Sequence, residues 1–254
     1  MCGKIIHMRL TESTNYSRAD LHMHTNLGDG WASPARVIQQ AIHRGLRVIA
    51  VTDHDHIEGA KRVADLLAQQ EPSPPLLQMI TGVEVSTRQG HLLGLFVNRA
   101  PKALRSVEAS IEAIKEQGGL VIIPHPLGRL VPSLSRAKIN ELLDRGFSID
   151  GIEIYNPSPA NASMRSTVRL ANQHWQLAEM GGSDAHFWQH IGSAYTLFPG
   201  SSPEDLRRAI LERTVRAGGQ EIPPARLPTG VYIAQCAWSW FVDPPRRMMR
   251  TFRK

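Results

Sequence analysis

Histidine and carboxylate side chains gather in five short motifs along this 254-residue chain. The motifs are His22-Met23-His24, Asp53-His54, Glu84, His125 and Asp184-Ala185-His186. Imidazole nitrogens and carboxylate oxygens are the usual ligands of divalent transition metals. Residues i and i+2 of a strand point to the same side, so both histidines of the first motif can reach one ion, and the last motif repeats that spacing. The sequence therefore predicts a metal centre.

The expected ligand set also contains Asp29 and His91. Asp29 lies in the glycine-containing loop 27–30, which can turn a carboxylate back toward the first motif. His91 begins a predicted strand, whereas the other ligands follow strand ends. The complete set is His22, His24, Asp29, His54, Glu84, His91, His125, Asp184 and His186. Because a first-row metal takes only about four to six ligands, we expect two or three divalent ions.

The charge of this set indicates the substrate. Its imidazoles are neutral and its three carboxylates do not cancel the charge of two or three ions, so the pocket stays positive and favours an anion such as a phosphate ester. Closely spaced ions can share a hydroxide with a pKa of about 7 and stabilise attacking and leaving oxygens. We therefore expect hydrolysis of a phosphomonoester or phosphodiester of a small metabolite, a nucleotide or an oligonucleotide end.

Further residues could serve the reaction. Asp53 could orient a ligand histidine or pair with a base, and we assign it a catalytic role together with His186. Arg129, on the loop after His125, could hold phosphate oxygens bidentately or be a solvated loop arginine. His56 could touch substrate or only shape its loop. Asp20 could support the first motif or be structural.

Other chemistry is not indicated. We expect no ligand role for His7, His43 and His174, while His190 could have one or not. The sequence has no Gly-x-Ser-x-Gly elbow, and its two cysteines, Cys2 and Cys236, form no metal-binding pair. A covalent serine or cysteine mechanism is therefore not expected.

Alternating strands and helices must position the ligands. Apolar runs predict strands at 18–23, 47–52, 78–85, 91–97, 120–124, 149–155, 177–181 and 194–198, and their near-continuous hydrophobicity is typical of strands covered on both faces. Helices are expected at 33–44, 58–70, 104–117, 135–145, 160–175 and 203–213. About seven such units favour a (β/α) barrel, whose active site lies at the carboxyl ends of the strands.

The motifs resemble those of the polymerase and histidinol phosphatase (PHP) family of metal-dependent phosphoesterases. The resemblance rests on residues 20–25, 52–55, 82–84, 124–126 and 182–186, which occur in the family's order. It implies a distorted (β/α)7 barrel and a trinuclear site of manganese, iron or zinc. This sequence carries His56 where many members have a small hydroxyl residue, and it has no polymerase body.

The resemblance also implies how the ligands divide among the ions. One ion would use His22, His24, Glu84 and Asp184; a second Asp29, His54 and His186; and a third Glu84, His91 and His125, with Glu84 bridging.

The C-terminal segment differs from the rest in charge. Of the formal net charge of +6, five charges come from Arg246, Arg247, Arg250, Arg253 and Lys254. We divide the chain into a hydrolase domain, 1–225, and an apolar segment with a basic tail, 226–254. The apolar run 231–242 is too short to span a bilayer. It could pack on the barrel, anchor at an anionic membrane surface, or leave the tail to steer a nucleic acid.

Two function classes remain open. A phosphoesterase agrees best with a complete ligand set. The alternative is a non-catalytic metal-binding module that binds nucleic acid or a membrane surface through its basic tail, and an amide or lactone hydrolase is a weaker option. With no signal-peptide pattern, we expect a cytoplasmic protein. The sequence leaves the oligomeric state open.

Overall fold

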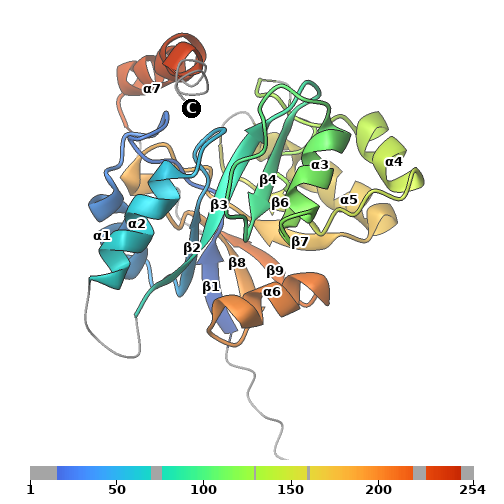
Figure 1. Ribbon diagram of the computed structural model, residues 1–254, viewed down its shortest axis with the longest axis horizontal. Coiled ribbons are helices and arrows are strands. Elements are labelled where there is room, and N and C mark those ends of the chain that lie inside the picture. The colour runs from blue at the N-terminus through green and yellow to red at the C-terminus, as the bar shows by residue number, and fades with distance from the viewer. Residues whose placement is uncertain (1–15, 70–75, 129, 159–160, 220–226, 247–254) are drawn as a thin grey trace, which may run out of the picture.

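The computed structural model describes residues 16–69, 76–128, 130–158, 161–219 and 227–246. In this part of the chain a nine-stranded sheet curls into a nearly closed barrel, in the order β7-β6-β5-β4-β3-β2-β1-β8-β9 (Figure 1). The strands are β1 (Tyr16–Asp20), β2 (Val48–Val51), β3 (Gln78–Ser86), β4 (His91–Leu95), β5 (Leu120–Ile123), β6 (Gly151–Tyr155), β7 (Ala178–Gly181), β8 (Ala194–Pro199) and β9 (Arg216–Gly219). The predicted barrel is confirmed, and β9 was not expected.

Strand direction departs from a uniform parallel barrel at two places. β1, β2 and β3 are parallel, as are β5, β6 and β7. β4 runs antiparallel to both of its neighbours, and β8 is antiparallel to β1 and β9. Where β7 meets β8, Thr196 Oγ1 lies 3.1 Å from the Gly181 nitrogen and 3.0 Å from its oxygen. This side chain links β7, at one end of the sheet order, to β8, the strand next to the other end.

The strands are buried on both faces, as their apolar runs predict. Every residue of β2 (Val-Ile-Ala-Val) and of β5 (Leu-Val-Ile-Ile) is buried. Inward side chains such as Val48, Ile122 and Phe198 fill the barrel interior. Outward ones pack against the surrounding helices. The packed interior leaves chemistry only to the two ends of the barrel.

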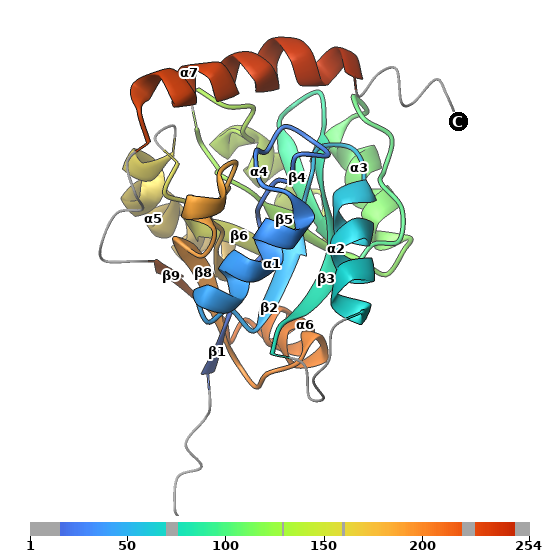
Figure 2. The same cartoon turned by 90° about the vertical axis from the view of Figure 1, so that its left-hand side faces the viewer.

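Most helices lie outside the barrel (Figure 2). They are α1 (Pro34–His43), α2 (Glu58–Ala68), α3 (Val107–Lys115), α4 (Arg136–Asp144) and α5 (Arg165–Trp175). Serine hydroxyls cap α1, α3 and α4 by accepting backbone N–H bonds. The helix expected from residue 104 begins later, because Leu104 has a left-handed φ of 57° and Ser106 supplies the cap.

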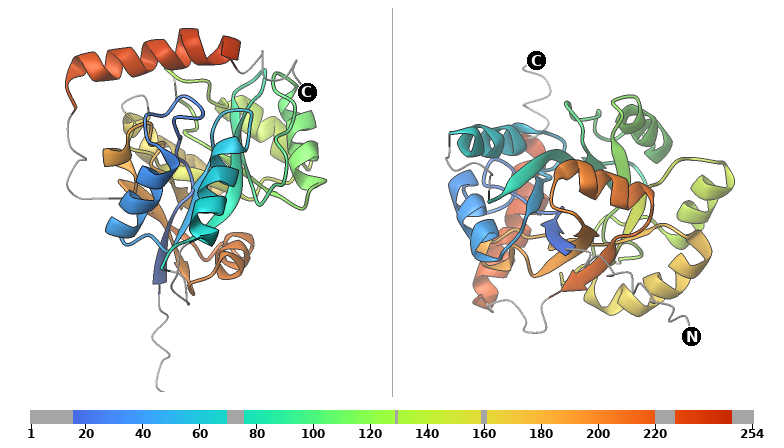
Figure 3. Two further views of the ribbon diagram at one scale, coloured as in Figure 1. Left: turned by 60° about the vertical axis from the view of Figure 1, so that its left-hand side comes forward. Right: turned by 90° about the horizontal axis from the view of Figure 1, so that it is seen from below.

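Two further helices cross the ends of the barrel. α6 (Pro203–Leu211), capped by a Ser202–Asp205 capping box, closes the amino end (Figure 3). At the opposite end α7 (Thr229–Ala237) continues through the π-helical turn η3 (Trp238–Val242) to Arg246 (Figure 2). We call residues 229–246 the rim helix.

The rim helix realises one of the alternatives for the C-terminal segment, a helix packed on the barrel. The predicted domain boundary after residue 225 lies outside the described residues and stays a prediction. In the described ranges, no helix combines the length and hydrophobicity needed to cross a membrane.

Candidate metal centre

Backbone pairing brings the predicted motifs together at the carboxyl end of the barrel. An isolated parallel bridge joins Met23 to Ala185, so the first and last motifs lie side by side. A second bridge joins His54 to Glu84. Because side chains flanking a bridged residue share one direction, the first bridge turns the predicted ligands of the first and last motifs toward one centre. The second bridge places His54 directly beside Glu84.

His91 lies at this centre although it begins its strand. β4 runs antiparallel to β3 and pairs His91 with Ser86, the last residue of β3. The start of β4 is therefore at the same end as the carboxyl termini of the parallel strands. His91 Nδ1 is 2.7 Å from Glu84 Oε1.

Glu84 lies in the middle of the cluster. On one side, Oε1 is 2.7 Å from His91 Nδ1 and 3.0 Å from His125 Nε2. On the other, Oε2 is 3.2 Å from His22 Nε2, 3.3 Å from His24 Nε2 and 3.5 Å from His54 Nδ1. The two oxygens thus face different histidine groups, which is the geometry of a carboxylate that can bridge two ions.

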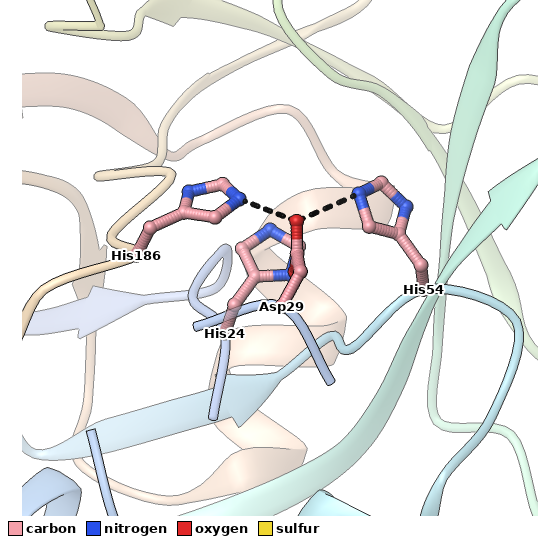
Figure 4. Close-up of side chains that lie close together, drawn as sticks. All are labelled: His24, Asp29, His54 and His186. Atoms are coloured by element: carbon pink, nitrogen blue, oxygen red, sulfur yellow. Dashed lines mark hydrogen bonds and ion pairs between the residues drawn. The ribbon is translucent and has the colours of Figure 1, made fainter. Parts of the chain in front are cut away.

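Asp29 gathers a second group, shown in Figure 4. Its Oδ2 is 3.1 Å from His186 Nε2 and 3.8 Å from His54 Nε2, and its Oδ1 is 3.3 Å from His24 Nδ1 (Figure 4). These four side chains come from loops that follow β1, β2 and β7. The loop 27–30 turns the carboxylate back toward the first motif, as predicted.

Asp184 completes the cluster near the first motif. Its Oδ1 is 3.4 Å from Nε2 of both His22 and His24. Asp184 and His125 both have positive φ values, 52° and 27°. A positive φ in a non-glycine residue costs on the order of 1–3 kcal/mol. Such a conformation is kept only where the surrounding structure enforces it, often at functional sites.

All nine predicted ligands are thus brought together, in overlapping groups. Atoms that could share an ion occur in the sets His24/Asp29/His54/His186, His22/His24/Glu84, His22/His125/Asp184 and His54/Glu84/His91. The first set contains the second ligand group implied by the resemblance, with His24 added. His24 and His54 each belong to two sets, so the assignment of ligands to individual ions stays a prediction.

The donor atoms agree with a bound cation. His24 Nδ1 and Nε2, Asp29 Oδ1 and His54 Nδ1 are buried and make no hydrogen bond within the described ranges. Buried polar atoms are rarely left this way, because each unsatisfied atom costs free energy. Ions held between these atoms would satisfy them, and imidazole and carboxylate ligands together suit manganese, iron or zinc.

The electrostatics of the protein without ions lead to the same conclusion. Burial opposes ionisation of Glu84, but the histidines around it, led by His54, His91 and His22, hold its pKa well below the ordinary value. Burial lowers the pKa of His24, but Asp29 and the neighbouring carboxylates raise it to about 10. The carboxylates therefore attract positive charge, which protons or metal ions can supply.

Glu153 is a site residue that the motif search missed. It is buried in β6 and accepts a hydrogen bond from His22 Nδ1 at 2.8 Å, while its other oxygen accepts the His125 backbone N–H at 2.8 Å. The first contact fixes the His22 ring with Nε2 toward the centre. Its signal in the sequence is a carboxylate within the apolar strand Gly-Ile-Glu-Ile-Tyr, since unpaired acids are rarely buried.

The remaining candidates have varied surroundings. Asp53 is buried and accepts two 2.7 Å hydrogen bonds from Thr25, through its backbone nitrogen and its hydroxyl. His56 Nδ1 lies 2.9 Å from Glu58 Oε2. Arg129 lies outside the described residues. The catalytic role of Asp53 and the substrate roles of His56 and Arg129 stay predictions.

Two other open residues are placed by their contacts. The buried carboxylate of Asp20 accepts backbone N–H bonds from Ser183 and Gly192, at 3.0 and 2.8 Å, and so ties β1 to the last motif. His190 stacks against Tyr232 of the rim helix, with Nε2 3.3 Å from the tyrosine oxygen. Both contacts are structural, one within the barrel and one to its covering helix.

The rim helix reaches the centre through Ser239, which the sequence did not single out. Ser239 Oγ donates a 2.6 Å hydrogen bond to Asp29 Oδ2, the oxygen that also faces His186 and His54. Gln235 Nε2 donates to the same hydroxyl at 2.6 Å. The helix is therefore coupled directly to a predicted ligand.

Comparison with known proteins agrees with this centre. The family model described as PHP domain matches residues 20–183, and the model described as PHP-associated matches 167–215. The chain belongs to the PHP domain family. A solved two-domain protein of Bacteroides vulgatus containing a predicted PHP-like metal-dependent phosphoesterase superposes on this PHP domain with a TM-score of 0.68 at 19% identity, covering 82% of this chain and 66% of that one.

Curated relatives of this PHP domain include named enzymes. A 5'-3' exoribonuclease of Haemophilus influenzae is 32% identical over 79% of this chain and 65% of its own length. A 3',5'-nucleoside bisphosphate phosphatase of Chromobacterium violaceum is 34% identical over 38% of this chain and 33% of its own length. Family and relatives together support a hydrolase with a multi-metal site.

Proposed function

We propose that this PHP domain hydrolyses a phosphomonoester or phosphodiester at the end of a nucleotide or short oligonucleotide, using two or three manganese, iron or zinc ions. The names of the two curated relatives support the nucleotide class. A small phosphorylated metabolite is the broader form of the same proposal.

The position of Glu84 carries the proposal. Its two oxygens face separate histidine groups at 2.7–3.5 Å, so one carboxylate can hold two ions close together. When bound, such a pair neutralises phosphate charge and activates water. A cluster of two or three ions with three carboxylate ligands remains positive, which favours a phosphate over a neutral amide or lactone.

His186 is the residue best placed to meet substrate. Its side chain is 19% exposed, whereas those of His22, His24 and Asp29 are at most 1% exposed. Its Nε2 faces Asp29 and its Nδ1 donates to the Asp184 carbonyl oxygen at 3.0 Å, so the ring is held in place with its exposed edge toward the mouth. A catalytic role for His186 stays a proposal. Asp53 is proposed as a support, since Thr25 occupies both of its oxygens.

The rim helix favours small or terminal substrates. It crosses the end of the barrel above the centre (Figure 2) and contacts Asp29 through Ser239. A nucleotide or a chain end can approach beside a helix more easily than the middle of a long polynucleotide can.

The test combines metal content with turnover. Purified protein is assayed by mass spectrometry for bound metal and with p-nitrophenyl phosphate, bis-p-nitrophenyl phosphate, a nucleoside 3',5'-bisphosphate and a 5'-phosphorylated oligonucleotide. We expect stoichiometric metal and turnover that His22→Ala abolishes and His43→Ala, on the outside of α1, leaves unchanged. Metal without turnover on any ester would favour the alternative, a non-catalytic metal-binding module. Absence of metal would contradict both functions.

Contact of the basic tail with nucleic acid or an anionic membrane is a separate proposal, as is a cytoplasmic location. Neither is needed for hydrolysis.

A further inference from the structure

The rim helix presents a polar face to the barrel. Gln235, Ser239 and Asp243 are spaced four residues apart and so lie on one side of the helix. Gln235 and Asp243 are buried, and Ser239 between them bonds to Asp29. Gln235 and Asp243 are the buried residues between Thr229 and Arg246. Polar contacts at this face, together with the ring of Tyr232 against Phe187 and His190, hold the helix over the centre.

Its opposite face is apolar and exposed. Ile233, Trp240 and Phe241 are 64%, 63% and 73% exposed. Together with Tyr232, Cys236 and Ala237 they line a shallow hollow on the outer surface of the helix. A surface helix of a globular protein normally directs its apolar stripe inward. Because Ser239 and Gln235 hold the other face on the barrel, this apolar face is available to a partner from outside.

Charge identifies the kind of partner. The described part of the helix reaches Arg246, and the sequence continues with Arg247, Arg250, Arg253 and Lys254 without an acidic residue. A second copy seated face to face would cover the apolar side chains but would offer the arginines no exposed acid from the facing helix, because Asp243, the acidic residue of the rim helix, is buried. A nucleic acid would attract the arginines but would leave Ile233 and Ala237 without a complementary surface.

An anionic lipid surface complements both features. Tryptophan and phenylalanine side chains enter the boundary between headgroups and acyl chains, and arginines bind the lipid phosphates. We propose that the rim helix and the basic tail bind an anionic membrane surface through the face of Ile233, Trp240 and Phe241. The helix lies flat across the barrel end, so the metal centre would sit about one helix diameter, roughly 10 Å, from the lipid.

The test uses the 254-residue chain and vesicles of phosphatidylcholine alone or mixed with phosphatidylglycerol. We expect co-sedimentation with the mixed vesicles, weakened by salt, and little with phosphatidylcholine alone. The double variant Trp240→Ser/Phe241→Ser should lower binding about tenfold or more, since it removes the two largest exposed side chains. The matched control is Leu211→Ser, which removes a 53% exposed side chain from α6 at the other end of the barrel.

Each outcome decides the proposal. The proposal would be overturned if Leu211→Ser lowered vesicle binding as much as the double variant does. It would also be overturned if the unaltered chain did not bind phosphatidylglycerol vesicles. The proposal would also be overturned if the chain formed a dimer without lipid and the double variant were monomeric. The same holds if the chain bound single-stranded RNA more tightly than the vesicles. Circular dichroism on each variant identifies a folding defect. His22→Ala should bind vesicles like the unaltered protein, so a failed phosphoesterase assay leaves this result readable.

Discussion

A helix crosses each end of this barrel, and the two helices do so with opposite chemistry. At the amino end α6 inserts Leu206, Ala209 and Ile210, all at most 2% exposed, into the barrel core. At the carboxyl end the rim helix meets the barrel with Gln235, Ser239 and Asp243 and exposes its apolar side chains. The end without predicted ligands can be closed by hydrophobic burial. The end with them needs a polar cover, because an apolar one would leave buried charges unpaired.

The difference extends to how each helix begins. Ser202 caps α6 through a capping box with Asp205, and Pro203 occupies the first helical turn. The rim helix begins after Pro228 without a side-chain cap. α6 is thus stabilised both locally and by tertiary burial, and the rim helix depends on a few polar contacts. We expect α6 to contribute to folding stability and the rim helix to function.

The largest expected effect is on the free energy of unfolding, which variants in α6 should lower far more than variants in the rim helix. Leu206→Ala should lower the free energy of unfolding by about 2–5 kcal/mol, because it leaves a cavity in the barrel core. Ile233→Ala on the rim helix should change it by less than about 0.5 kcal/mol, as its side chain is already exposed. Urea denaturation followed by circular dichroism measures both. Similar losses in the two variants would mean that the helices close the barrel in the same way.

The second largest expected effect is a loss of metal affinity when the Glu153 carboxylate is replaced. Glu153→Gln keeps the shape of the side chain but replaces one accepting oxygen with an NH2 donor. That donor would face another donor, which is His22 Nδ1, the His125 backbone nitrogen or Asn156 Nδ2. Metal affinity should fall about 10–100-fold, as is typical when the partner of a ligand histidine is lost. Competition with a chelator measures it. Glu179→Gln, in the neighbouring strand β7, is the control, and an unchanged affinity in Glu153→Gln would remove its positioning role.

The pH dependence of metal binding tests the electrostatics of the carboxyl end. Asp29 and its neighbours raise the pKa of His24 to about 10 against the opposing effect of burial. A raised histidine pKa stabilises the metal-free protein below the unfolded pKa of about 6.5, and that contribution is lost as pH rises through 10. An ion bound by His24 must displace this proton, so its affinity should fall about tenfold per pH unit from 8 to 6.

Calorimetry in buffers of different ionisation enthalpy checks this by counting the protons released on metal binding. At least one proton should leave per protein near neutral pH. Binding without proton release would mean that the histidines are already neutral in the metal-free protein.

The smallest expected effect belongs to the rim helix. Ser239→Ala removes one hydrogen bond to Asp29 and should lower metal affinity or turnover only severalfold, since a single partly exposed bond to a charged group contributes on the order of 1–2 kcal/mol. Cys236→Ser, on the outer face of the same helix, is the matched control. A loss as large as that of Glu153→Gln would place Ser239 among the main supports of the centre.

The sequence by itself determined which predicted ligands gather at one end of the barrel and the elements that hold them. His22, His54, His125 and Asp184 lie at or just past the carboxyl ends of predicted strands, and parallel strands bring these ends to one rim. The N-caps Ser33 and Ser202 could be predicted because capping is an interaction between residues close in the sequence. Strand and helix existence depends on neighbours in sequence, so these parts could be predicted.

Tertiary structure decided what depends on residues distant in the sequence. The reversed direction of β4 explains why His91, at the start of a strand, joins Glu84. Glu153 became a support for His22 across 131 positions, and Ser239 reached Asp29 across 210. The apolar run 231–242 resembled a core element, because hydrophobicity alone does not state which face is buried. In the folded structure Ser239 of the rim helix contacts Asp29, and the apolar side of the helix is therefore the exposed one.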